Sequence, residues 1–192
     1  ATFNRCYADM TEPLENRLTP AVVEQLFPES SGRGQVIGDP PVATVLSGDM
    51  LIGYLFSTHE TVRPAGYSGN SFDIVIGLGK DGIIVGHKLL EEHEPLISDG
   101  MIGPKKFELF LNGLNGFKVG TSRPFKQRIT KNGPQYLNEY KNMDAVSGAT
   151  ISALAMHRAI INSALRVGHL NGIIDGEHKD LTLDLFSYEQ KS

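Results

Sequence analysis

The sequence predicts an α+β domain in which antiparallel β-hairpins form a twisted sheet that packs against a few helices. Two pairs of β-rich runs are each joined by a short turn containing Gly and Asp, and one long run near the C-terminus is rich in Ala, Leu and Ile. Strands that come in hairpins, with helices set apart from them in the sequence, are typical of this class. A chain of 192 residues is long enough to bury a substantial core in one domain.

We expect residues 1–40 to form an N-terminal extension of helix and loop. The run 19–27 opens with a Thr that can cap a helix, places Pro20 at the first helical position and stops before Pro28. Gly, Asp and Pro then interrupt 30–41, and we interpret this segment as a loop.

Two antiparallel hairpins are predicted at the start of a main domain that we expect to span 41–170. In each hairpin, two β-rich runs flank a turn: 42–46 and 51–57 around 47–50, and 72–78 and 83–90 around 79–82. Beyond them, 104–113 runs from Pro to Gly and predicts a short helix with Phe107, Phe110 and Leu111 on a buried face. Residues 114–143 are rich in Gly, Pro and Asn and favour no particular element.

The run 150–167 contains no Pro or Gly and predicts the longest helix, with Arg166 in its last turn and Gly168 as its stop. The residues just before it then lie at a helix N-terminus. We expect 171–192 to be a C-terminal extension of the same unit or a tail, with a possible strand at 181–186.

Composition and charge exclude several classes of function. The formal net charge is −4 without a basic stripe, which argues against nucleic-acid binding. The single Cys6 excludes an intrachain disulfide and a cysteine-based zinc site. No apolar run reaches about 18 residues, so we predict no membrane-spanning segment. Because the chain opens with Ala1 and shows no signal-peptide pattern, we expect a processed or excised soluble fragment.

The most informative motif is D-x-x-S-G-A-T, which runs from Asp144 through Ser147, Gly148 and Ala149 to Thr150. At a helix N-terminus the backbone N–H groups lack helical partners and the dipole end is positive. The small residues Gly148 and Ala149 would let a phosphate approach those groups, and a hydroxyl at this position could be esterified. The alternative interpretation is that Ser147 and Thr150 only cap the helix.

Two further segments precede this motif. Gly66-Tyr67-Ser68-Gly69 lies before the run 72–78, and His93-Glu94-Pro95 follows the second hairpin. Taken alone, the first segment is an ordinary turn, and His93 and Glu94 are solvated residues at the end of a strand. Tyr67 is also suited to border a flat aromatic ligand.

These three elements, in this order, resemble the flavinylated FMN-binding domain family, which includes the NqrC and RnfG subunits of redox pumps and the NosR group. The resemblance extends over about 53–167. Glu94 runs directly into Pro95, whereas NqrC and RnfG usually have a Thr between the Glu and the Pro. This departure, together with the L-T-P…L-F-P pattern in 14–28, favours the NosR, NirI and PceC/CprC groups, and NosR above all.

The resemblance implies that Thr150 carries FMN through a phosphodiester and that the chain is an electron carrier, not an enzyme by itself. It implies that Asp144 is part of the sequence that a flavin transferase with FAD as donor recognises, and that Asp144, Ser147, Gly148 and Ala149 belong to the cofactor site. It also implies that the flavin site includes Tyr67, Ser68, His93, Glu94 and Pro95.

The setting that the resemblance implies is the periplasmic, extracytoplasmic side of an inner membrane. There the domain would belong to a NosR-type protein that supports nitrous oxide reduction. Its partners would be the flavin transferase, the membrane and iron–sulfur portions of its own full-length chain and, as a candidate, nitrous oxide reductase.

Other functions have less support from the sequence. A regulatory or scaffold module in which flavin is dispensable is the main alternative, while a structural domain that has lost its cofactor is disfavoured because Thr150 is intact. A metal site would need His59, His87 and His93, but the last two would lie about 20 Å apart on one strand, so scattered surface histidines are favoured. A hydrolase with Ser147 as nucleophile lacks the G-x-S-x-G pattern.

Overall fold

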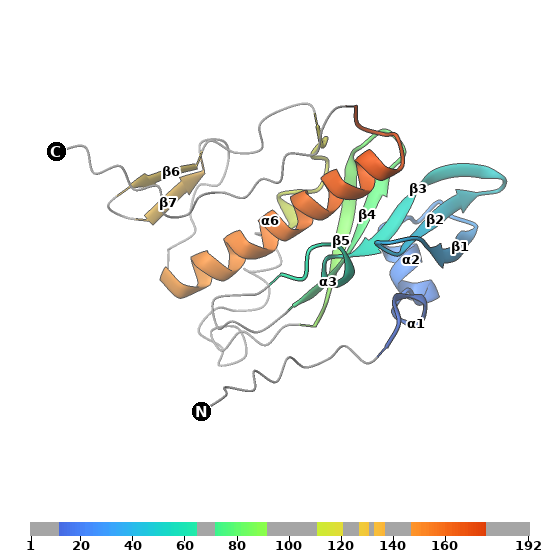
Figure 1. The fold of residues 1–192 in the computed structure, drawn as a ribbon, viewed down its shortest axis with the longest axis horizontal. Coiled ribbons are helices and arrows are strands. Elements are labelled where there is room, and N and C mark those ends of the chain that lie inside the picture. Colours follow the sequence, from blue (N-terminus) through green and yellow to red (C-terminus); the bar gives the residue numbers. More distant parts are fainter. Residues whose placement is uncertain are drawn as a thin grey trace.

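A five-stranded antiparallel sheet lies between two groups of helices in the computed structural model, which describes residues 12–64, 72–91, 111–120, 127–130, 133–136 and 147–175 (Figure 1). The strands follow each other in chain order: β1 Gly32–Ile37, β2 Val42–Ser47, β3 Met50–Ser57, β4 Asp73–Gly79 and β5 Ile84–Glu91. The helices are α1 Leu14–Arg17, α2 Pro20–Leu26, α3 Thr58–Thr61 and α6 Ser147–Leu170. The predicted α+β class is confirmed.

Both predicted hairpins are confirmed. β2 and β3 are joined by Gly48 and Asp49, where Gly48 adopts the left-handed φ of +59° that a two-residue hairpin turn requires. β4 and β5 are joined around Asp81, whose Oδ1 accepts a hydrogen bond from the Ile83 N–H at 3.1 Å. The predicted α2 is confirmed as well, with the Thr19 side chain accepting from the Val22 N–H at its N-terminus.

The interpretation of 30–41 as a loop is wrong, because β1 lies within it and pairs with β2. β1 is an edge strand with mostly half-buried or exposed residues, and it owes its structure to the backbone hydrogen bonds that β2 supplies. A small separate hairpin, β6 Gln127–Thr130 and β7 Gly133–Tyr136, occupies part of the segment that favoured no element. The predicted strand 181–186 and most of the predicted helix 104–113 lie outside the described residues.

The long helix was predicted to stop at Gly168, and this is wrong: α6 continues to Leu170 and ends where Gly172 takes a φ of +67°. Gly168 has a different role. Ile174 folds back onto it, and a Cβ at Gly168 would lie 2.5 Å from Ile174 Cδ1. Among the described residues, no helix has the length and apolar character needed to cross a membrane.

Strands β3 and β4 are covered on both faces, so alternate side chains enter two different cores. Phe56, Ile74 and Ile76 face the core under α6, whereas Leu55 and Val75 face the core under α1 and α2. All five are fully buried, and each such side chain contributes about 1.5–3 kcal/mol relative to an exposed one. The two cores explain why 51–57 and 72–78 are apolar almost throughout.

Glycines in the sheet make room for Phe27, the residue that follows α2. The Phe27 ring lies over β3 and β4, where a Cβ at Gly53 would be 2.5 Å from Phe27 Cζ and one at Gly77 would be 3.0 Å from Cε2. On the next strand, a Cβ at Gly86 would meet only Leu26 Cδ2, the flexible end of a side chain, at 3.0 Å. Because these three positions are glycines, α2 can approach the sheet closely.

We predict that Gly53→Ala lowers the free energy of unfolding by about 1–3 kcal/mol, because the added methyl group collides with the Phe27 ring and the Leu78 carbonyl. Gly86→Ala is the matched control and is expected to cost less than about 1 kcal/mol, since the end of Leu26 can move aside. Urea denaturation of the two variants measures the difference. Equal losses would contradict the close approach of Phe27.

An exposed cluster fastens α1 to β1. The Arg33 guanidinium donates to Glu15 Oε1 at 2.6 Å and to the Leu18 carbonyl at 3.1 Å, while the Val36 N–H donates to Glu15 Oε2 at 2.9 Å. The hydrogen bond from Arg33, followed by that from the Val36 N–H, lowers the pKa of Glu15 below its ordinary value. The ionised form of Glu15 is thus the one that stabilises this junction.

Since the folded-state pKa of Glu15 is the lower one, its contribution is complete above the unfolded-state pKa and is lost as the pH falls through the folded-state value. We expect the wild type to be more stable than Glu15→Gln at about pH 7 and the gap to close towards about pH 3. Urea titrations at a series of pH values measure it. A gap for Glu15 that widened in acid would refute the assignment.

Candidate functional site

The motif residues Ser147, Gly148, Ala149 and Thr150 form the first turn of α6, as the sequence predicted for a helix N-terminus. The structure describes the backbone of this turn but not its side chains. Its N–H groups lack partners within the helix, and no acidic residue lies among its four residues. The positive end of a helix dipole is therefore offered to an anion without a competing carboxylate in the turn.

This turn lies apart from the part of α6 that packs on the sheet. Of the α6 side chains that the structure describes, those of Met156, Ile160 and Ala164 are buried in the core. In Figure 1 the first turns of α6, in pale orange, extend past the five-stranded sheet. The C-terminal half of the helix anchors it, and the N-terminal turns carry the motif.

The other predicted site residues, Tyr67, Ser68, His93, Glu94, Pro95 and Asp144, lie outside the described residues. The strand ends nearest to them are described. Asp73 opens β4, Glu91 closes β5, and the two are partners in the sheet register. The segments before β4 and after β5 therefore leave the sheet from adjacent positions at the same end.

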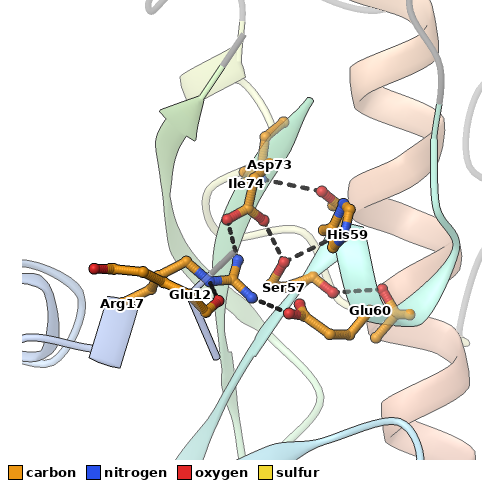
Figure 2. A network of polar contacts seen from close by, with 9 residues as sticks. Glu12, Arg17, Ser57, His59, Glu60, Asp73 and Ile74 are labelled. Carbon is orange, nitrogen blue, oxygen red and sulfur yellow. Dashed lines mark hydrogen bonds and ion pairs between the residues drawn. The ribbon is translucent and has the colours of Figure 1, made fainter. Parts of the chain in front are cut away.

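A buried polar network stands at this end of the sheet (Figure 2). The Arg17 guanidinium donates from Nη1 to Asp73 Oδ2 and from Nη2 to Glu60 Oε1, and the Ser57 hydroxyl donates to Asp73 Oδ1. The side chain of Asp73 is 0% exposed, that of Arg17 8% and that of Glu60 20%. At such burial a carboxylate is stable only when charged and hydrogen-bonded partners surround it, as they do here.

The network also fixes α3, the helical turn after β3. Ser57 Oγ accepts from the His59 N–H at 3.0 Å and so caps α3, while the Ile74 N–H donates to Thr58 Oγ1 at 3.0 Å. Together these bonds hold the start of β4 against α3 with buried groups from both. Hydrogen bonds between buried groups are strengthened by the low local dielectric, which favours a rigid junction.

On its other side α3 is tied to α6. The Thr61 hydroxyl hydrogen-bonds to Ser163 of α6, and Arg166 Nη1 donates to the Thr61 carbonyl at 2.6 Å. Arg166, which the sequence predicted only to lie in the last turn of the helix, thus connects the helix that carries the motif to the end of the sheet. Sequence reasoning missed this network, although an Asp at the head of an apolar strand was a signal for a buried ion pair.

Two of the histidines expected at the surface are less exposed than the sequence predicted: His87 is 8% exposed and His59 is half-buried on α3. His157 of α6 is 3% exposed. Within the described part of the chain, no group of three or more His, Cys, Asp or Glu side chains could hold a metal ion. His93, the third predicted ligand of the disfavoured metal site, lies outside that part.

Comparison with known proteins identifies relatives of this chain. The profile of the family described as FMN-binding domain matches residues 66–165, which is 100 of the 192 residues. Regulatory protein NosR of Stutzerimonas stutzeri is 28% identical over 153 residues, which cover 80% of this chain and 20% of NosR. The G component of the ion-translocating oxidoreductase complex of Erwinia tasmaniensis is 32% identical over 118 residues, 59% of this chain and 50% of that component. Protein NirI of Paracoccus denitrificans is 24% identical over 126 residues, 66% of this chain and 16% of NirI.

The chain therefore spans a fifth or less of the length of the NosR and NirI relatives and half of the oxidoreductase component. Its matched segment begins just before β4 and includes most of α6, so the Thr150 turn lies within it, whereas Arg17, Ser57 and Glu60 precede it.

We predict that Asp73→Ala lowers the free energy of unfolding by about 3–5 kcal/mol, because it leaves the buried Arg17 guanidinium without one of its two carboxylates. The control is Glu24→Ala, which removes an exposed carboxylate from α2 and should change stability by less than about 0.5 kcal/mol. Chemical denaturation measures both. Equal losses in the two variants would show that the network contributes less to the free energy of unfolding than predicted.

Proposed function

The chain belongs to the FMN-binding domain family, and on that premise we propose that it is an electron-transfer domain that carries FMN covalently on Thr150. The observation that carries the proposal is that Ser147 to Thr150 form the first turn of a long helix within the matched segment. A phosphate ester needs a hydroxyl for the bond and donors for the phosphate oxygens, and this turn supplies both.

The residues of the turn fit the phosphate of FMN on chemical grounds. The N–H groups of Ser147, Gly148 and Ala149, which have no partner within the helix, lie at the positive end of α6 and are suited to bind phosphate oxygens. Neither Gly148 nor Ala149 has a side chain large enough to block the approach of a phosphate. Thr150 would contribute its Oγ to the ester bond. We propose Asp144 as part of the sequence that the attaching enzyme recognises.

Attachment would be a phosphoryl-type transfer in which the Thr150 hydroxyl is the nucleophile. Its oxygen forms a bond to the FMN phosphorus of an FAD donor, the anhydride bond between the two FAD phosphorus atoms breaks, and AMP leaves. The hydroxyl proton passes to a base of the transferase. We propose a separate flavin transferase for this step, since the chain would be its substrate.

The cofactor supplies one- and two-electron redox chemistry, while the protein determines its position, burial and hydrogen bonding. In this proposal Tyr67 and Ser68 border the flavin from the segment before β4, and His93, Glu94 and Pro95 border it from the segment after β5. The adjacency of Asp73 and Glu91 supports a common site for the two segments. The domain then transfers electrons without transforming a substrate of its own.

We propose that this domain works on the periplasmic side of a membrane as part of a longer NosR-type protein that supports nitrous oxide reduction. The likeness to NosR and NirI supports this setting. Electrons would pass between the flavin, the membrane and iron–sulfur portions of the full-length chain and a respiratory partner such as nitrous oxide reductase. The likeness to a component of an ion-translocating oxidoreductase supports an electron-transfer role in general.

A second candidate function is a regulatory or scaffold module in which flavin is dispensable. The relative named regulatory protein NosR favours this alternative. The two functions differ in one measurable respect: a chain that folds but cannot take up flavin should fail as an electron carrier and succeed as a scaffold. A flavin-free Thr150 variant in the full-length protein, tested for growth by respiration, separates them.

We predict that Thr150→Val abolishes covalent flavin, because the valine methyl group that replaces the hydroxyl cannot form the ester bond. The fold should persist, since the change conserves the shape of the side chain at a helix start. Intact mass spectrometry of denatured protein, after export and coexpression with a flavin transferase, measures the attachment. Thr150→Ser, which keeps a hydroxyl, is the matched control.

Wild-type protein should gain the mass of one FMN on the peptide that contains Thr150, and Thr150→Val should remain unmodified. Covalent flavin on Thr150→Val would refute the assignment of the acceptor. An unmodified wild type, with an active transferase and FAD present, would instead leave the scaffold function.

A further inference from the structure

We propose that Arg17 is a positioning residue for the flavin: through its two carboxylate partners it fixes the end of the sheet from which the flavin-bordering segments leave. This inference rests on the proposed function. It assigns a role in the flavin site to α1, which lies outside the segment that the FMN-binding domain profile matches.

The Arg17 side chain is suited to this role by the geometry of its contacts. Its Nη1 binds Asp73 and its Nη2 binds Glu60, while its Nε donates to the Glu12 carbonyl at 3.0 Å. One planar guanidinium therefore links α1, α3 and β4. A lysine ammonium has the same charge, but it lacks the rigid fork that spans two carboxylates.

Two of the three elements that Arg17 joins, α3 and β4, flank in the sequence the segment that contains Tyr67. This segment begins after α3, at the end held by Glu60, and it rejoins the sheet beside Asp73. Asp73 is paired in turn with Glu91, from which the chain continues to His93. A displacement of Asp73 would consequently shift the starting points of both segments together.

The same junction reaches the helix that carries Thr150. α3 holds α6 through the Thr61–Ser163 hydrogen bond and through Arg166, so a change in the position of α3 is passed to α6. The network thereby relates the acceptor residue on α6 to the segments proposed to border the flavin ring.

The chain contains a matched control in Arg33. Both arginines bind an acidic side chain and a backbone carbonyl near α1, and both anchor that helix. Arg33 connects α1 to β1 at the edge of the sheet, whereas Arg17 connects it to β4 and α3. Variants at the two positions therefore share the loss of an anchoring contact of α1 and differ in whether the end of β4 is affected.

The test uses the flavin-loaded chain, prepared with a flavin transferase, with the substitutions Arg17→Lys, Arg33→Lys and the double change Arg17→Met with Asp73→Asn. The double variant removes the charge of Arg17 together with that of Asp73, its fully buried partner, and leaves only Glu60, which is 20% exposed, without its arginine, which keeps a folded sample available. The primary measurement is the equilibrium constant for electron exchange between the flavin and a reference dye. A second one, on the flavin-free protein, is hydrogen exchange at the Ile74 amide.

We expect the exchange equilibrium to shift by about 2- to 30-fold in the two Arg17 variants and to stay at the wild-type value in Arg33→Lys. The Ile74 amide, which donates to Thr58, should exchange faster in the Arg17 variants alone. A merely structural role would change stability in urea without moving the electron equilibrium of the folded protein.

Two failures are distinguishable. If the wild type takes up flavin and the Arg17 variants match Arg33→Lys in both measurements, the positioning role is refuted and the proposed function stands. If the wild type takes up no covalent flavin at all, the proposed function fails and the positioning role fails with it.

Discussion

The burial of β3 and β4 on both faces is the constraint on which the rest of the structure depends. A strand covered on one side can alternate apolar and polar residues, but these two strands need apolar residues or glycines on both faces. Phe27 and Leu26 lie over glycines on the α2 side, and the α6 side is filled by Phe56, Ile76 and their neighbours. With both faces closed, polar contacts are left to the ends of the strands.

At the end of the sheet near Asp73, polar contacts gather because the faces of β3 and β4 are closed, and this end lies beside the segments predicted to contain the site. The first residue of β4 is an aspartate with no solvent exposure, and its charge is balanced by an arginine that comes from a short helix far away in the sequence. The same cluster caps α3, and α3 holds α6. In this domain of the FMN-binding family, the helix that carries the motif and the ends of the strands are thus joined through a few buried polar groups.

The strongest predictions from sequence came from local patterns. Hairpins with Gly and Asp in the turns, a Thr-Pro helix start and a long Ala-rich helix each depend on neighbouring residues, and the structure has them. β1 was missed because an edge strand with two glycines carries no alternation to detect. The end of α6 was misplaced because Gly168 serves a contact with Ile174, which is a tertiary reason and not a helix signal.

For the candidate site, too, the local features were predictable from the sequence and the long-range contacts were not. That Thr150 lies in the first turn of a helix followed from the motif and the run after it, and membership of the family is confirmed. Tyr67, Ser68, His93, Glu94, Pro95 and Asp144 stay predictions. The Arg17 network joins residues 56 positions apart in the sequence, and no local pattern contains that information.

Because α6 is anchored near its C-terminal end and carries Thr150 in its first turn, it works as a lever arm. Ser163 and Thr150 are separated by about 20 Å of helix at 1.5 Å per residue, so a tilt of a few degrees at the anchor displaces the first turn by roughly 1–2 Å. Electron transfer depends steeply on distance. The stiffness of this anchor, which combines the core packing of α6 with the Thr61–Ser163 and Arg166 contacts, therefore limits how sharply the position of the cofactor proposed on Thr150 is defined.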